Sequence, residues 1–135
     1  MNAGRGGNME TQSKTQGQLE AEISEAIIKF EREYMGRGPQ ETRTFIIEDM
    51  VVVRLRGVLT PAEKNLAGID PQSHGRTLIK QVRIELLEKA RPLLERIIHD
   101  ITGQALQSLH TDISTTTGER VVIFTLDGRC KFMKD

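Results

Sequence analysis

A stripe of apolar residues at helical spacing runs from Leu78 to Ile101, and no other feature of the sequence constrains the fold as strongly. Steps of three and four residues over this length predict one long helix with a single apolar face. Pro92 interrupts the pattern, but the stripe continues in phase on both sides, which favours a kinked helix over two separate helices. A second stripe from Leu19 to Tyr34 predicts another helix, which should end near the glycines and proline of residues 36–39.

β-branched segments follow each of these helices as a closely spaced pair. Short polar linkers separate the two members of each pair, which is typical of antiparallel hairpins. The four predicted strands are Thr42–Ile47, Met50–Arg56, Leu106–Ser114 and Arg120–Leu126. Val121 to Phe124 is apolar on both faces, so this strand should lie centrally in a sheet or have its second face covered by a partner.

A short helix is predicted between the first hairpin and the long helix. Thr60 is a suitable N-cap, Pro61 suits the first helical position, and Glu63 completes a capping box. The helix should run from Pro61 to about Leu66, and a loop from Gly68 to Gly75 should follow it.

The length of 135 residues and mass of 15.2 kDa suit a single domain. The predicted order is α-β-β-α-α-β-β, and the simplest architecture is an α+β two-layer sandwich with two long helices on one face of a four-stranded antiparallel sheet. Residues 1–16 carry too little apolar surface to fold and are expected to be a disordered tail. The domain should span residues 17–127, with a C-terminal tail over 128–135.

Composition narrows the functional classes. The formal net charge is zero, aromatic residues make up 4% of the chain and Trp is absent, which together argue against nucleic-acid binding. The longest strongly apolar run, Met50 to Val53, is far too short to span a membrane. Cys130 is the single cysteine and fits a reducing compartment, so a cytoplasmic location is expected.

Cations gather in two places that a fold could bring together. Two arginines lie on the second strand and four further cations near the start of the long helix: Arg54, Arg56, Lys64, Arg76, Lys80 and Arg83. Such side chains could hold phosphate, carboxylate or bicarbonate, since arginine matches planar oxyanions. The alternative is ordinary surface pairing with nearby glutamates. The candidate anion site comprises Arg54, Arg56, Lys80 and Arg83.

A polar row on the third strand is the second candidate site. His110 and Asp112 are two residues apart, so they leave the same face together with Ser108. A metal would need three or four ligands, and no others cluster in the sequence, so a solvated strand face is the competing interpretation. Cys130 lies between basic residues without a readable catalytic partner and is interpreted as a free thiol. We expect no catalytic residue, metal or cofactor, and therefore no enzyme.

Apolar residues on both sides of the predicted sheet also suggest an assembly. Ile46 and Val52 are expected on the face opposite Phe45, Ile47, Val51, Val53 and Leu55. Helices on one side would leave such surface in contact with water, so a homodimer with the sheet in its interface is predicted. Arg54 and Arg56 would lie near its rim, and His110 and Asp112 could approach them in a shared pocket.

Four sequence segments together resemble one family: EREYMGRGPQE, VVVRLRGVLTPAEKNLA, GRTLIKQVR and HTDISTTTGERVVIFTL. From about Leu19 to Leu126 the chain is similar to the MpsC-like family. The resemblance implies a small soluble bacterial protein associated with a Na+-translocating, membrane-potential-generating system, in a genomic setting linked to inorganic-carbon uptake. It carries over no catalytic residue.

Three functions follow as hypotheses. The first is a non-catalytic accessory or regulatory protein of a membrane ion or bicarbonate transport complex. The second is a stand-alone regulatory module that binds a small anion or nucleotide. The third is an enzyme that uses His110 and Asp112.

Overall fold

The computed structural model describes residues 14–68 and 74–133. Its elements follow the order α-β-β-α-α-β-β, which is the predicted α+β arrangement. They are α2 (Gln16–Tyr34), β1 (Glu41–Ile47), β2 (Met50–Arg56), α3 (Pro61–Gly68), α4 (His74–Thr102), β3 (Leu106–Ile113) and β4 (Arg120–Leu126). The predicted strands therefore match to within one residue at each end.

The four strands form one antiparallel sheet in the order β1-β2-β4-β3. Strand β4 lies beside β2 in the centre, as the apolar character of both its faces predicted. In the first hairpin, Glu48 adopts a φ of 56° in a two-residue turn, and this turn places Ile47 opposite Met50. In the second hairpin, Gly118 has a φ of 76° and its amide donates to the Ser114 carbonyl at 2.8 Å.

The register corrects the predicted faces of β1. Ile46 pairs with Val51 and is buried, whereas Phe45 pairs with Val52 on the other face. Phe45 and Ile47 were predicted to share a face with Val51, which is wrong. The two-residue turn sets the register, and a shift of one residue moves every side chain of a strand to the opposite face.

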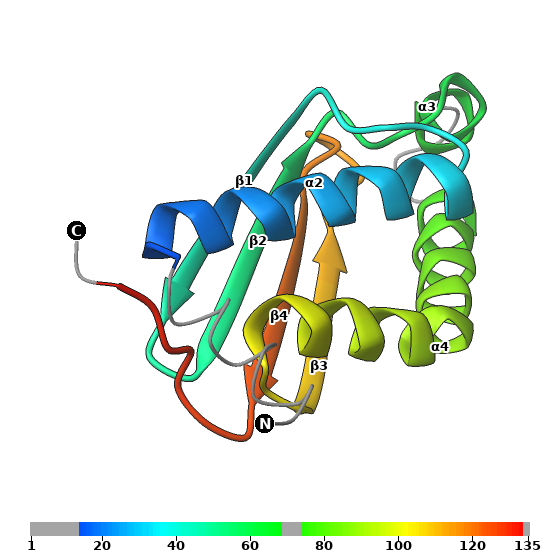
Figure 1. The fold of residues 1–135 in the computed structure, drawn as a ribbon. Coiled ribbons are helices and arrows are strands. Elements are labelled where there is room, and N and C mark those ends of the chain that lie inside the picture. The colour runs from blue at the N-terminus through cyan, green and yellow to red at the C-terminus, as the bar shows by residue number, and fades with distance from the viewer. Residues whose placement is uncertain (1–13, 69–73, 134–135) are drawn as a thin grey trace.

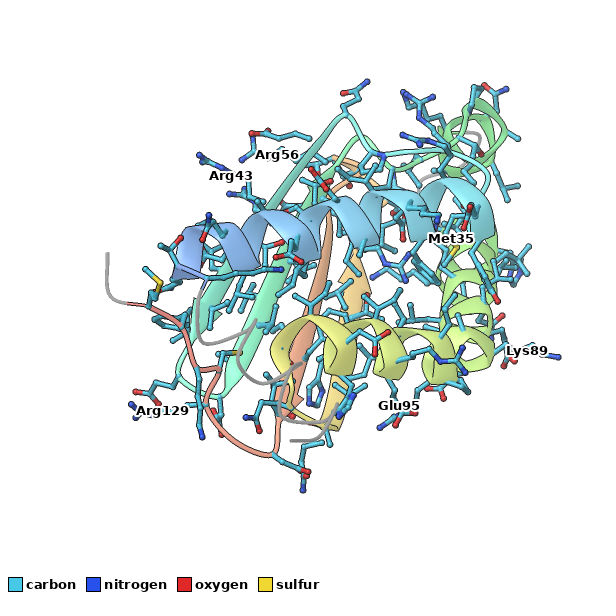
Figure 2. The ribbon with its side chains drawn as sticks, viewed as in Figure 1. Met35, Arg43, Arg56, Lys89, Glu95 and Arg129 are labelled. Atoms are coloured by element: carbon cyan, nitrogen blue, oxygen red, sulfur yellow. The ribbon has the colours of Figure 1, made fainter. Side chains whose placement is uncertain are left out.

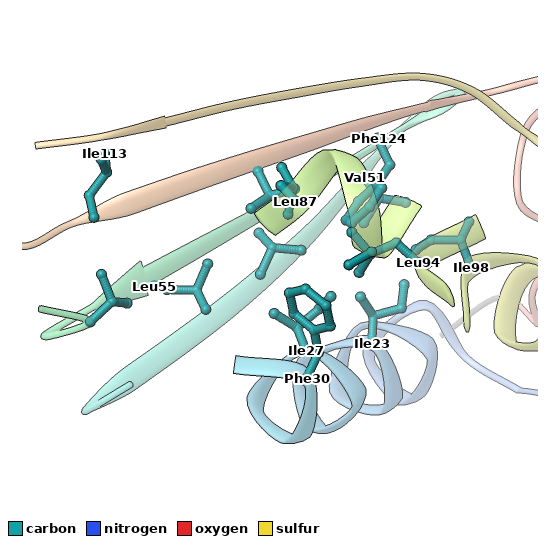
Figure 3. Packing of buried hydrophobic residues seen from close by; sticks show 14 of the residues in the cluster. Ile23, Ile27, Phe30, Val51, Leu55, Leu87, Leu94, Ile98, Ile113 and Phe124 are labelled. Atoms are coloured by element: carbon teal, nitrogen blue, oxygen red, sulfur yellow. The ribbon is translucent and has the colours of Figure 1, made fainter. Parts of the chain in front are cut away.

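Helices α2 and α4 both pack on one face of the sheet (Figure 1). The core lies between these layers, where Ile23, Ile27 and Phe30 of α2 meet Leu94 and Ile98 of α4 (Figure 3). Side chains of β2 and β4 close it from the sheet side: Val51, Val53, Leu55, Val122, Phe124 and Leu126. We call the other face of the sheet, which no helix of the described residues covers, the open face.

Helix α4 is continuous from His74 to Thr102 with Pro92 inside it, so the predicted kink without a break is confirmed. The helix turns a sharp corner in Figure 1, and Lys89 and Glu95 lie on either side of it in Figure 2. The limb before the corner begins earlier than the apolar stripe indicated. It also projects past the sheet, so its apolar residues Leu78 and Val82 are 47% and 53% exposed instead of buried.

Both other helices begin with a capping box. Thr15 caps α2, where Gln18 completes the box, so this helix starts inside the segment predicted as a tail. The remainder of that tail, residues 1–13, lies outside the described residues, as does the middle of the predicted loop between α3 and α4. At α3 the predicted box is confirmed: the Glu63 amide donates to Thr60 Oγ1 at 3.1 Å, and the Thr60 amide donates to Glu63 Oε1 at 2.9 Å.

Candidate functional site

A cavity of about 720 Å³ opens at the end of the sheet where β2 finishes. Its walls come from the end of β2, the loop between β3 and β4, and helix α3. Half of the described residues that line it are cationic or hydroxyl-bearing: Gln40, Arg54, Arg56, Gly57, Leu59, Lys64, Ala67, Gly68, Arg76, Thr115, Thr116, Thr117, Gly118 and Glu119. We call this the basic cavity, because the described residues that line it include four cations and one carboxylate.

Two of these cations are already paired with that carboxylate. Arg54 Nε contacts Glu119 Oε2 directly, and Arg56 Nε lies 3.8 Å from the same oxygen. Arg56 also lies 3.6 Å from Glu41 across the β1–β2 pair. The arginine side chains remain 45% and 52% exposed, so their guanidinium groups keep donors that an incoming anion can reach.

The other two cations stand on the opposite wall. Lys64 lies on α3 and Arg76 on the first turns of α4, and neither forms an ion pair with another described residue. A hydrogen bond orients the Arg76 side chain: its Nε donates to the Ala67 carbonyl at 3.3 Å. Gly75 permits this arrangement, because a Cβ there would lie 2.4 Å from the Leu66 carbonyl oxygen. Glycine thus lets α4 start directly against α3.

A buried charge network fixes α3, and with it one wall of the cavity. Arg83 donates to both carboxylate oxygens of Glu63, at 2.9 and 2.7 Å, and also to the Val58 carbonyl at 3.0 Å. Glu31 lies 3.8 Å from Arg83 and accepts from Arg120 at 3.0 Å. These four charges join α2, α3, α4 and β4, so we call Glu31, Glu63, Arg83 and Arg120 the buried network.

The pKa values within the buried network shift in different directions. Burial raises the pKa of Glu31, although the charges of Arg120 and Arg83 act in the opposite sense. Burial also lowers the pKa of Arg120. Partial burial acts to raise the pKa of Glu63, but hydrogen bonds from Arg83 and the Thr60 amide, with the Arg83 charge, hold it below its usual value.

The four residues of the predicted anion site are not brought together. Arg54 and Arg56 line the basic cavity. Arg83 lies on α4 within the buried network, where it is 3% exposed. Lys80 pairs with Asp112 at 3.4 Å at the β3 edge. Lys64 and Arg76, two further cations of this part of the chain that are not among the four predicted residues, line the basic cavity with Arg54 and Arg56.

The predicted polar row is on the open face. Ser108 Oγ lies 3.3 Å from His110 Nε2, and Asp112 is exposed beside Lys80. Within the described residues, no group of three or more His, Cys, Asp or Glu side chains could hold a metal ion. Cys130 is buried, and burial raises the pKa of its thiol to about 11, which makes a reactive thiolate unfavourable at neutral pH.

The sequence of the chain matches a known protein family. The model of the family described as "Na+-translocating membrane potential-generating system (MpsC)" matches residues 15–128. The chain belongs to the MpsC family. It is 45% identical over 113 residues to the uncharacterized protein YbcI of Bacillus subtilis (strain 168), covering 84% of this chain and 89% of YbcI.

A second relative is more distant. The uncharacterized protein YrhF of Bacillus subtilis (strain 168) is 26% identical over 118 residues, which cover 84% of this chain and 92% of YrhF. No solved structure matches the chain. Among the helices of the described residues, none has the length and apolar character needed to cross a membrane.

Proposed function

We propose that this MpsC-family protein is a non-catalytic accessory or regulatory component of a membrane system that transports ions or bicarbonate or generates a membrane potential. The observation that carries the proposal is the family match over residues 15–128, whose description names a Na+-translocating system. The protein would act from the cytoplasmic side, as a homodimer, by binding a membrane-embedded subunit.

The projecting limb of α4 supports binding to another protein. Leu78, Val82 and Ile84 are 47%, 53% and 50% exposed, and a shallow hollow of about 500 Å³ lies among them. Glu85 and Lys89 flank the apolar residues in the same hollow. An apolar centre with a charged rim is the usual composition of a protein interface.

Capture from membranes tests the proposal. A tagged copy should retain integral membrane transport subunits from detergent-solubilised membranes of its native host, and the double variant Leu78→Glu/Val82→Glu should lose them. Arg96→Glu, an exposed change elsewhere on α4, is the matched control and should behave like the wild type. If no integral membrane protein is enriched over the tag alone, the accessory role is wrong.

The basic cavity favours a second function, binding of a small oxyanion or the phosphates of a nucleotide. Arg54, Arg56, Lys64 and Arg76 surround one space, and the three threonines of the β3–β4 loop offer hydroxyl groups. Bound ligand stabilises the folded state by about 2.7 kcal/mol at a hundredfold excess over Kd.

Thermal unfolding at constant ionic strength tests this second function. Phosphate, bicarbonate and ATP are compared with chloride. A bound anion should raise the Tm of the wild type by several degrees and raise that of Lys64→Gln/Arg76→Gln much less, whereas Arg96→Gln should respond like the wild type. Equal responses of all three proteins would exclude the basic cavity as the binding site.

A further inference from the structure

We propose that a second copy of this chain covers the open face, with the two copies related by a two-fold axis parallel to the strands. This assigns both the surface and the orientation of the dimer. It goes beyond the proposed accessory function, because it follows from the sheet register and does not depend on a membrane partner.

The open face carries more apolar surface than a solvated sheet needs. Phe45 and Ile47 are 44% and 51% exposed, and Val52, Val121 and Ile123 are half-buried beside them. Four strands about 4.8 Å apart and about 3.4 Å per residue give a face of roughly 19 by 24 Å. Two faces of this size bury roughly 900 Å² together, which is below the ~1,200 Å² at which standard specific interfaces begin and suits a weak dimer.

The register arranges the open face in rows that cross all four strands in the order β1-β2-β4-β3. The first row is Ile47, Met50, Thr125 and Ser108. The second row is Phe45, Val52, Ile123 and His110. The third row is Arg43, Arg54, Val121 and Asp112. The third row therefore begins with a cation on one edge strand and ends with an anion on the other.

A two-fold axis parallel to the strands makes this pattern complementary to itself. The rotation exchanges the two edge strands and keeps each row at the same position along the strand direction. Each row of one copy therefore faces the same row of the other copy, with the strands in reverse order. Arg43 of one copy then faces Asp112 of the other, and this contact occurs twice. Val52 faces Ile123 at the centre, and Phe45 faces the His110 ring.

A two-fold axis perpendicular to the strands also brings the two open faces together, but it gives poorer complementarity. That rotation reverses the order of the rows. It places each strand opposite the equivalent strand of the second copy. His110 would face His110, and Arg43 would face Ile47 without a carboxylate opposite it. Arg54 faces an apolar residue in both arrangements, Val121 about the parallel axis and Met50 about the perpendicular axis, so it does not distinguish them. Only the parallel axis places a carboxylate opposite Arg43, and an unpaired cation covered by apolar surface is costly. Arg43 and Asp112 therefore select the parallel axis.

This orientation has a consequence for the basic cavity. A rotation about an axis parallel to the strands leaves each end of the sheet at the same end of the dimer. The two cavities, each beyond the end of β2, would therefore lie at one common end. Arg43 and Arg56, labelled in Figure 2, come from the neighbouring strands β1 and β2, and both are exposed.

Charge reversal tests the interface. Arg43→Glu and Asp112→Arg should each raise the dimer Kd at least about tenfold, because each creates two like-charge contacts. The double variant Arg43→Glu/Asp112→Arg should return the Kd to within about threefold of the wild type. Lys80→Gln removes the cation that pairs with Asp112 within the same chain and should leave the Kd nearly unchanged. A monomeric wild type, or a double variant as weak as the single variants, would overturn the proposal.

Cysteine crosslinking tests the axis independently of these charges. In a Cys130→Ser background, Arg43→Cys/Asp112→Cys should form a covalent dimer under mild oxidation, whereas His110→Cys should remain uncrosslinked. Circular dichroism confirms that each variant is folded. Crosslinking through His110→Cys but not through the Arg43/Asp112 pair would show the perpendicular axis and overturn the assignment.

Discussion

The two faces of the sheet use arginine for opposite purposes. On the covered face, Arg120 of β4 is 1% exposed and donates to Glu31 at 3.0 Å. On the open face, Arg54 of the neighbouring strand β2 is 45% exposed and contacts Glu119 at the mouth of the basic cavity. The two arginines are separated by one step of the register, since Arg120 pairs with Leu55. Whether an arginine stabilises the fold or is available for binding therefore depends on the face of the sheet on which it lies.

Breaking the buried network should have the largest effect on stability. Arg120→Met leaves Glu31 buried without its closest partner, and we expect it to destabilise the protein by about 3–5 kcal/mol. The double variant Glu31→Leu/Arg120→Met removes both charges and should recover most of this loss. Urea unfolding of the three proteins measures the difference. A single variant within about 1 kcal/mol of the wild type would mean that the pair contributes little to the covered face.

Glu63 should matter less than Arg120, and its contribution should depend on pH. Glu63→Gln weakens the two-point contact with Arg83 and should cost about 2 kcal/mol at pH 7. Because the pKa of folded Glu63 lies below its usual value of 4.5, the stability it contributes is complete above that pH and is lost as pH falls through the lowered pKa. The difference between wild type and variant should therefore shrink in acid. Urea unfolding at pH 7 and at pH 3.5 measures it, and a constant difference would contradict the role of its ionised form.

Thr60→Ala should have a smaller effect than either change in the network. It removes the acceptor for the Glu63 amide and should cost about 1 kcal/mol. Thr60→Ser retains the hydroxyl and serves as the control. If the denaturant midpoints of Thr60→Ala and Thr60→Ser coincide, the cap does not stabilise α3.

Arg54→Gln should affect stability least. Its ion pair with Glu119 is partly exposed, and such pairs contribute under about 1 kcal/mol. The same substitution should lower the affinity for phosphate several-fold, because it removes a cation from the basic cavity. Calorimetric titration with phosphate, paired with urea unfolding, checks both parts. A large stability loss with unchanged affinity would reverse the roles assigned to the two faces.

The sequence predicted the secondary structure well because its apolar periodicities are long and its caps are regular. It misplaced Arg83 because cations were interpreted as surface residues. Yet Arg83 occupies the buried stripe of α4, four residues from both Ile79 and Leu87. Arg120 likewise lies on the same face of β4 as the buried residues Val122, Phe124 and Leu126. A charge at an apolar position of a periodic pattern was the signal that could have indicated the buried network.

The basic cavity could not be predicted in the same way. Its walls come from β2, the β3–β4 loop and the junction of α3 with α4, which are distant in sequence. Only the sheet order and the close approach at Gly75 bring Arg54 and Arg76 to one space. The faces of β1, by contrast, could have been predicted. The predicted linker Glu48–Asp49 already pairs Ile47 with Met50 and Ile46 with Val51, and directly paired residues lie on the same face of a sheet.

Double-mutant cycles on the two arginine pairs test the contrast between the faces most directly. Urea unfolding gives the coupling energy of Glu31 with Arg120 and of Arg54 with Glu119, each from the wild type, two single variants and one double variant. The account predicts a coupling of at least about 2 kcal/mol on the covered face and below about 0.5 kcal/mol on the open face. Equal couplings, or the larger one between Arg54 and Glu119, would contradict it.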